Sequence, residues 1–239
     1  MGKTTGISWA TSTWNPWMGC DKVSAGCKNC YAERDMKRYG RIFNGKVVRT
    51  SDKTFNAPLK WNLPARSRIF VCSWSDFYHV DADDWRHEAW EMIRSLPQYD
   101  FLIPTKRPER IGIEGDGFMI PDNVWLGASV ENQEMFDVRM QYLLDAPAKV
   151  HWLSVEPMLG PIDFHFPNYP NPNKDMWVVF GGESGPGCRP CDPEWIRDGV
   201  KQCRAVNVPV FVKQLGGWPD TRKNLEDLPF DLQIREFPV

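Results

Sequence analysis

Short apolar runs alternate with polar clusters along the chain from residue 69 onward. Each run ends in polar residues, a stretch with helical spacing follows, and the next apolar run begins. The repeat has the length of one βα unit, and near-continuous apolar strands are typical of parallel sheets covered on both faces. We therefore expect parallel strands at Ile69–Cys72, Phe101–Ile103, Val124–Leu126, Val150–Leu153, Trp177–Phe180 and Pro209–Val212.

The stretches between these runs place apolar residues at the spacing of an amphipathic helix. Asp192 is expected to cap the last of them, because Pro193 follows it in the first helical position. The expected helices are Asp84–Leu96, Glu131–Ala146 and Pro193–Val206, and an earlier strand and helix are expected at Ile7–Trp14 and Tyr31–Tyr39.

This rhythm predicts an α/β fold with one domain over residues 1–239, a complete or partial (β/α) TIM-like barrel with mostly parallel strands. Three segments depart from the rhythm. A cysteine loop occupies residues 19–31, a segment rich in Lys, Arg and Asn at about residues 40–68 is interpreted as an insertion or lid, and about residues 219–239 form a C-terminal extension.

Composition narrows the class of protein. The chain has 239 residues and a net charge of −2, so it lacks the overall basic character of many nucleic-acid-binding proteins. Neither a signal peptide nor a membrane-length apolar run is visible, so we expect a cytoplasmic protein without a membrane partner. Seven cysteines in a reducing compartment favour metal or redox chemistry over disulfides.

Polar residues follow each expected strand, where the active sites of β/α barrels are built. We interpret Glu156, Glu131 and Lys106 as candidate catalytic residues, and Arg107 beside Lys106 as a candidate for binding a carboxylate or phosphate. Loop residues are often polar without a function, which is the alternative for each of them. The candidate cofactor-binding residues are Ser73, Asp76, Ser129, Ser154, Gly181, Gly182, Glu183 and Lys213.

Cys20, Cys27 and Cys30 form the strongest motif, with the spacing C-x6-C-x2-C. We expect these three thiolates to bind a metal. A [4Fe–4S] cluster held by three cysteines leaves one iron free for a substrate or cofactor, whereas a structural zinc needs a fourth protein ligand. The first histidine is His79, so the cluster is favoured; zinc with a remote ligand, or ordinary buried cysteines, are the alternatives.

A second pair, Cys188 and Cys191, follows the Gly181-Gly182-Glu183 motif. The pair is interpreted as reduced thiols without an essential role, although a second metal site is an alternative. The two glycines permit close approach of the backbone to a ligand, and a neighbouring carboxylate can hold an amino group or a ribose hydroxyl. A tight turn that needs glycine is the other interpretation.

Seven ordered motifs over about residues 7–218 resemble a phage-borne three-Cys-motif protein family of unassigned function. That family is in turn similar to radical S-adenosylmethionine (SAM) enzymes of the spore photoproduct lyase type. The motifs are Trp14-Asn15-Pro16, the cysteine loop with Tyr31-Ala32, Phe70-Val71-x-Ser73-x-Ser75-Asp76, Thr105 to Arg110, Trp125 to Glu131 with Ala128 variable, Glu156-Pro157-x-Leu159-Gly160-Pro161, and Gly181 to Gly185.

The resemblance implies a partial barrel in which Cys20, Cys27 and Cys30 hold a [4Fe–4S] cluster whose free iron binds SAM. An electron from a reductant protein would then cleave SAM and start radical chemistry on an unknown substrate. It also implies a bacterial or phage-infected host. Two features depart from the radical SAM pattern: the usual loop is C-x3-C-x2-C, and the Gly-Gly-Glu motif usually follows the second strand, which makes Ser73 or Asp76 the alternative to Glu183.

Two other functions are consistent with the residues. A locally basic stretch with interleaved aromatic residues is typical of nucleic-acid binding, either by a metal-stabilised binding protein or by a radical enzyme that acts on a nucleobase. A hydrolase or isomerase that uses Glu131, Glu156 and Glu183 is the third possibility. The basic residues are Lys22, Lys28, Arg34, Lys37, Arg38, Arg41, Lys46 and Arg49.

Overall fold

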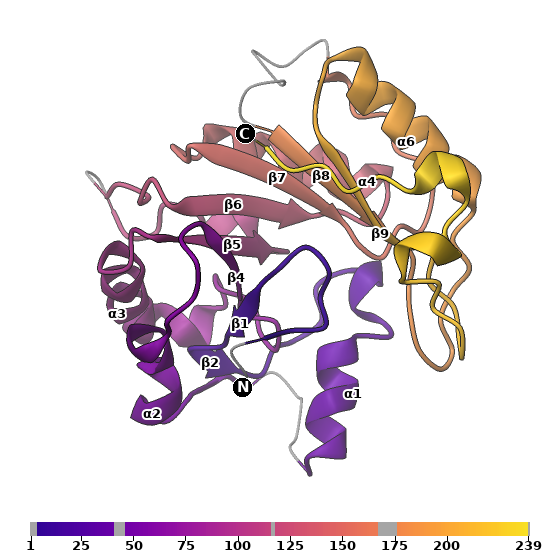
Figure 1. The fold of residues 1–239 in the computed structure, drawn as a ribbon. Coiled ribbons are helices and arrows are strands. Elements are labelled where there is room, and N and C mark those ends of the chain that lie inside the picture. Colours follow the sequence, from indigo (N-terminus) through magenta and orange to yellow (C-terminus); the bar gives the residue numbers. More distant parts are fainter. Residues whose placement is uncertain (1–3, 41–45, 116–117, 167–175, 239) are drawn as a thin grey trace.

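The computed structural model describes residues 4–40, 46–115, 118–166 and 176–238. Its centre is a sheet of seven strands in the order β1-β4-β5-β6-β7-β8-β9, and every neighbouring pair is parallel (Figure 1). The sheet curls into a half-barrel, which confirms the predicted α/β class and the partial form of the barrel. The strands are β1 (Ser12–Trp14), β4 (Ser67–Val71), β5 (Tyr99–Thr105), β6 (Val124–Ser129), β7 (Val150–Val155), β8 (Met176–Gly181) and β9 (Val210–Gln214).

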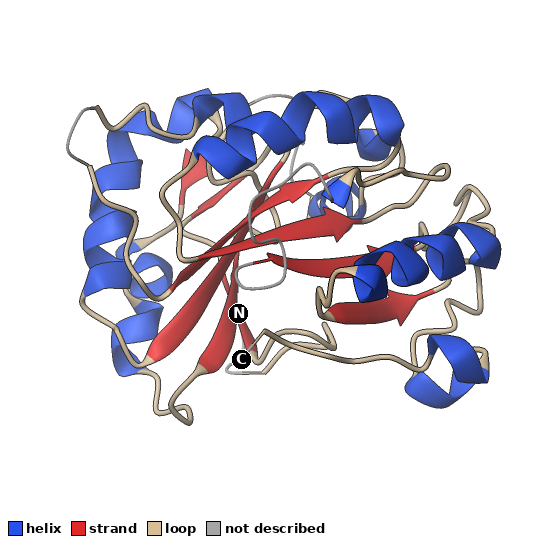
Figure 2. Cartoon of the chain, turned by 90° about the horizontal axis from the view of Figure 1, so that it is seen from above, coloured by secondary structure: helices blue, strands red, loops and turns tan. Residues whose placement is uncertain are grey.

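The helices are α1 (Tyr31–Arg38), α2 (Asp52–Phe55), α3 (Asp83–Arg94), α4 (Gln133–Asp145) and α6 (Pro193–Ala205). The longer helices α3, α4 and α6 lie on the outside of the curled sheet (Figure 2), whereas α1 borders the strand ends and α2 packs at the β1 edge. The carboxylate of Asp192 accepts a hydrogen bond from the backbone N–H of Glu194 at 2.9 Å, as expected of an N-cap. The predicted helix at Glu131–Ala146 instead begins at Gln133, because Asn132 adopts an extended conformation and caps it.

Alternate residues of the strands face two different hydrophobic clusters. Residues such as Ile69 and Phe101 pack outward in the cluster shared with the helices. The concave face carries an inner aromatic cluster, in which the ring of Trp152 lies 5.3 Å from Trp9 and 5.4 Å from Trp177. The core of this inner cluster is Trp9, Phe70, Leu102, Trp125, Trp152, Trp177, Val179 and Phe211.

Gly127 of β6 leaves the room that this inner cluster requires. A Cβ atom at position 127 would lie 2.5 Å from Nε1 of Trp152, so any larger residue would displace the indole ring. The chain has twelve tryptophans, of which seven are buried and four lie in this cluster, so packing explains much of the tryptophan content.

Two of the three segments outside the βα rhythm, the described part of the predicted lid and the C-terminal extension, cover the edges of the sheet. The short strand β3 (Val48–Arg49) pairs antiparallel with β2 (Trp17–Met18), and Phe55 packs against Trp14. At the other edge the C-terminal extension runs along β9, where the N–H of Val212 donates to Ile234 O at 2.9 Å. Covering an edge strand in this way prevents it from pairing with another chain.

No helix among the described residues is long and apolar enough to cross a membrane.

Candidate functional site

A cavity of about 340 Å³ opens at the carboxyl ends of the strands. All three cysteines of the predicted metal loop line it, together with nine other predicted site residues. These twelve residues are Cys20, Cys27, Cys30, Ser73, Asp76, Lys106, Ser129, Ser154, Glu156, Gly182, Glu183 and Lys213. The parallel strands bring these residues together because their carboxyl ends meet at one rim.

Two predicted site residues do not line this cavity. The side chain of Glu131 is fully buried beneath the cysteine loop. Gly181 lies behind Glu156: a Cβ atom at position 181 would be 2.4 Å from Oε1 of Glu156, so the glycine leaves space for that carboxylate. The described part of the predicted lid, residues 46–68, also contributes no residue to the lining, because it packs at the β1 edge.

The floor of the cavity is apolar and was not predicted from the sequence. Ile7, Trp9 and Phe70 form it at the edge of the inner aromatic cluster. The continuous apolar run at Ile69–Cys72 places Phe70 in a strand, but it does not show on which face of a closed or partly closed barrel its side chain lies. The cavity thus combines an apolar floor with a polar wall, as small-molecule sites commonly do.

The cysteine loop folds across the mouth of the half-barrel. Cys27 ends a short 3-10 helix (Ala25–Cys27) and Cys30 directly precedes α1. The loop begins at Gly19, whose φ of 104° is a conformation that favours glycine. The hydroxyl of Ser75 donates to Gly19 O at 2.5 Å and so ties the start of the loop to the end of β4.

The end of β5 holds the first part of the cysteine loop through a buried arginine. The Arg107 guanidinium binds the Asp21 carboxylate, and its Nη1 lies 3.6 Å from the sulfur of Cys20. Nη1 is also 3.3 Å from the carboxylate of Asp76. Asp76 in turn accepts hydrogen bonds from the Thr105 hydroxyl at 2.6 Å and the Lys106 N–H at 2.8 Å, which orients the strand end that carries Arg107.

The end of β6 holds the centre of the loop through Glu131. Its carboxylate accepts a hydrogen bond from the Gly26 N–H at 2.9 Å and pairs with Arg139 at 2.9 Å. Burial alone would raise the pKa of Glu131, but the Ser24 side chain, the Gly26 N–H and the Arg139 charge outweigh it and hold that pKa below its usual range. Glu131 therefore supports the loop from beneath, rather than facing a ligand in the cavity.

The end of β8 holds the last part of the loop through Glu183. The Asn29 amide donates to Glu183 Oε2 at 2.8 Å, and Arg189 binds both oxygens of the same carboxylate. Arg189 also donates to Ala25 O at 3.0 Å. Although burial acts to raise the pKa of Glu183, these donors lower it below the usual range. The carboxylate is already engaged by the loop, so it has little remaining capacity to hold a ligand amino group.

At the ends of β7 and β9, Glu156 and Lys213 form an ion pair at 2.9 Å. Ser129, Ser154 and Gln214 line the cavity beside them. These side chains present both donors and acceptors to the space between the floor and the cysteine loop. They are the described groups best placed to bind a polar ligand.

The three cysteines suit an iron–sulfur cluster by their chemistry. All are free thiols in one cavity, and burial, reinforced by the Asp76 charge, raises the pKa of Cys20 to about 12. Binding a metal must therefore displace a proton from this thiol. Among the described residues no three His, Cys, Asp or Glu side chains are grouped closely enough to hold a single metal ion. A [4Fe–4S] cluster does not require such convergence, because each cysteine binds a different iron.

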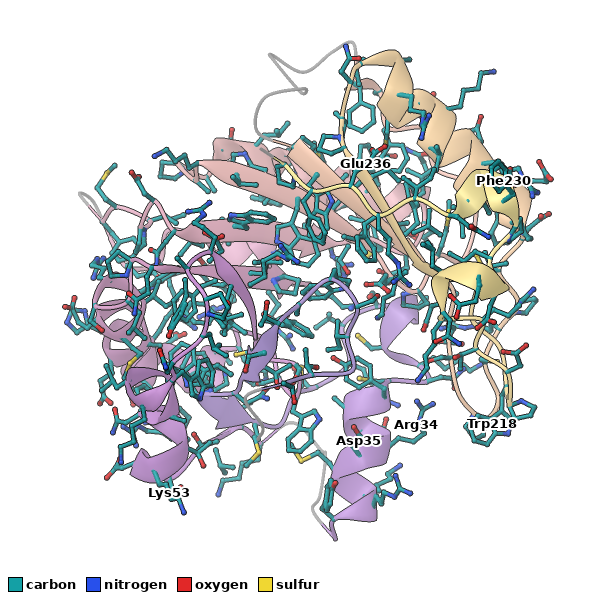
Figure 3. The ribbon with its side chains drawn as sticks, in the orientation of Figure 1. Arg34, Asp35, Lys53, Trp218, Phe230 and Glu236 are labelled. Carbon is teal, nitrogen blue, oxygen red and sulfur yellow. The ribbon has the colours of Figure 1, made fainter. Side chains whose placement is uncertain are left out.

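Several members of the basic stretch have partners within the protein. Lys22 and Lys37 both pair with Glu33, and Arg49 pairs with Asp52 and Glu88. Arg34 donates to Ser184 O at 3.0 Å, which places α1 beside the loop after β8; Arg34 and the exposed Trp218 are labelled in Figure 3. Arg41 lies outside the described residues. Fewer cations are thus available to phosphates than the sequence suggests.

The fold and the site together define a curled α/β half-barrel with a three-cysteine loop across the carboxyl ends of its parallel strands. The chain belongs to the family described as protein of unknown function (DUF5131), whose family model matches residues 4–230. Comparisons with curated proteins and with solved structures gave no match.

Proposed function

We propose that this protein is an iron–sulfur enzyme of the radical SAM type. The observation that carries the proposal is that Cys20, Cys27 and Cys30 share one cavity with the polar residues at the strand ends. When bound, a [4Fe–4S] cluster with one free iron and SAM would supply a reducing electron and a carbon-centred radical. The resemblance described above and the polar side chains that line the cavity beside the cysteines both support this assignment.

In this proposal the three cysteines hold the cluster, and three strand ends keep their loop in place. Arg107, Glu131 and Glu183 each bind a different part of the loop, so the ligands are organised before the metal arrives. Such organisation reduces the conformational entropy lost on binding. Glu183, first interpreted as a cofactor-binding residue, is assigned here to positioning.

The polar groups at the ends of β7 and β9, together with Lys106 after β5, would bind SAM and orient the substrate. Glu156 can accept from an amine or hydroxyl, and Lys213 and Lys106 can bind a carboxylate. The apolar floor formed by Ile7, Trp9 and Phe70 would keep water away from the part of the cavity next to it. Exclusion of water protects a reactive radical from side reactions.

The test is the iron and sulfide content of protein purified and reconstituted without oxygen. We expect about four iron and four sulfide per chain, loss of both in Cys27→Ala, and formation of 5′-deoxyadenosine from SAM on reduction. Cys203→Ala is the matched control, because Cys203 lies in α6 outside the cavity lining. A colourless wild-type protein with one tightly bound zinc would contradict the proposal.

A nucleic acid is the substrate class that the mouth of the cavity supports. Tyr31 lines the cavity and is 41% exposed, and Trp218 is 61% exposed on the segment that pairs with the loop after β8. Exposed aromatic rings can stack on nucleobases. We expect single-stranded oligonucleotides to quench tryptophan fluorescence in a salt-dependent manner, with several-fold weaker binding in Trp218→Ala. Equal binding by the variant would remove the support for this substrate class.

A further inference from the structure

One cysteine of the loop has an electrostatic environment that the other two lack. The Arg107 guanidinium is only 7% exposed and its Nη1 lies 3.6 Å from the sulfur of Cys20. Among the described residues no cationic side chain donates a hydrogen bond to Cys27 or Cys30. The buried guanidinium charge is therefore directed at Cys20, whereas the cation that acts on Cys27 and Cys30 is the exposed Lys22, which is paired with Glu33.

The position of Arg107 is determined by several contacts. Its Nη2 binds the carboxylate of Asp21 and lies 3.3 Å from Asp21 O, while Nη1 is shared with Asp76. The carboxylate of Asp21 is held in turn by Nε2 of His79 at 3.0 Å. The guanidinium cannot turn away from Cys20 without losing these partners.

We propose that Arg107 is a positioning residue that sets the reduction potential of a cluster bound by Cys20, and that Asp21 moderates its effect. A cationic donor next to a ligand sulfur withdraws negative charge and stabilises the reduced cluster. Asp21 neutralises part of the guanidinium charge. This inference rests on the proposed function, because it requires an iron–sulfur cluster on the three cysteines.

The two residues should therefore act in opposite directions. Removing the cation in Arg107→Met shifts the potential to more negative values. Removing the neighbouring anion in Asp21→Asn leaves more of the guanidinium charge to act on the sulfur, and shifts the potential to more positive values. A purely structural role would loosen the loop in both variants and would not produce shifts of opposite sign.

The experiment is a redox titration of the reconstituted full-length protein, followed by visible absorbance and EPR, with iron content measured in parallel. Arg110→Met is the matched control: Arg110 ends the same 3-10 turn (Pro108–Arg110) but pairs with Asp83 at 2.7 Å instead of the cysteine loop. We expect its potential to equal that of the wild type.

If Arg107→Met does not retain iron, Arg107→Lys keeps the test open, because it preserves the charge but loses the two-pronged contact. Its potential should lie between that of the wild type and that of Arg107→Gln, a variant that removes the charge. Unchanged potentials in iron-loaded Arg107 and Asp21 variants would overturn this inference alone. Failure of the wild type to bind any iron would instead overturn the proposed function.

Discussion

The pair formed by Glu131 and Arg139 permits a quantitative test of how the cysteine loop is supported. Glu131 is fully buried, Arg139 is 4% exposed, and their charged atoms are 2.9 Å apart. Replacing Glu131 with Gln keeps the shape and an oxygen for the Gly26 N–H, but leaves the Arg139 charge without its partner. Breaking a buried ion pair in this way costs about 3–5 kcal/mol.

Urea unfolding of the reduced apoprotein measures this cost without any metal. For a chain of this size, about 3–5 kcal/mol corresponds to a decrease in melting temperature of roughly 6–20 °C. Glu134→Gln, an exposed position in the first turn of the same helix, should change stability by less than about 0.5 kcal/mol.

The difference should also depend on pH. The folded-state pKa of Glu131 is lowered, so its ionised form contributes stability above its unfolded pKa, and that contribution is lost as the pH falls through the folded pKa. Wild type and Glu131→Gln should therefore converge in stability in acid. A variant within about 1 kcal/mol of the wild type at neutral pH would refute the assigned role of Glu131.

Two further predictions concern packing around the site. In Gly182→Ala the new Cβ would lie 2.0 Å from Leu215 O, so the free energy of unfolding of the apoprotein should fall by about 1–3 kcal/mol in a denaturant titration. Gly160→Ala, with open space at the Cβ position, should leave stability unchanged. Equal behaviour of the two variants would contradict the predicted clash. Deleting residues 233–239 removes two backbone hydrogen bonds to β9, worth about 1 kcal/mol each, and also the buried Ile234 and the Phe237 ring contacts. The melting temperature should therefore fall by more than about 4–8 °C, and light scattering should rise. Replacing the 91% exposed Phe230 with Ser should do neither.

The sequence predicts much of the frame of the site. Continuous apolar runs give the parallel strands, and the polar residues that follow them converge at one rim because parallel strands share a direction. Ser129, Ser154 and Lys213, selected only for their positions after strands, all line the same cavity. The three cysteines line it as well.

Sequence reasoning could not separate residues that face the cavity from residues that hold the loop. Glu131 and Glu156 look alike in the sequence, since each follows a strand. Glu131 binds Gly26, which is 105 residues away in the chain, whereas Glu156 pairs with Lys213 in the cavity wall. Such pairings depend on how strongly the sheet curls and on which side chains then lie within contact distance of the loop. Local sequence patterns contain neither piece of information.

Asn29 and Arg189 were missed for the same reason. Asn29 lies between two cysteines and carries no motif of its own, and Arg189 follows a glycine-rich turn. Their importance arises from a shared contact with Glu183. The only signal in the sequence is that Arg189 follows Glu183 closely along the chain, which allows their side chains to meet across the turn.

In the proposed function, the three cysteines of this loop hold a cluster with one iron open to SAM. The most direct measurement is the EPR spectrum of the reconstituted, reduced protein before and after the addition of SAM. We expect a [4Fe–4S] signal whose g values change when SAM binds, and no signal in Cys20→Ala. A cluster signal that SAM leaves unchanged, or a protein without a cluster, would contradict the proposed function.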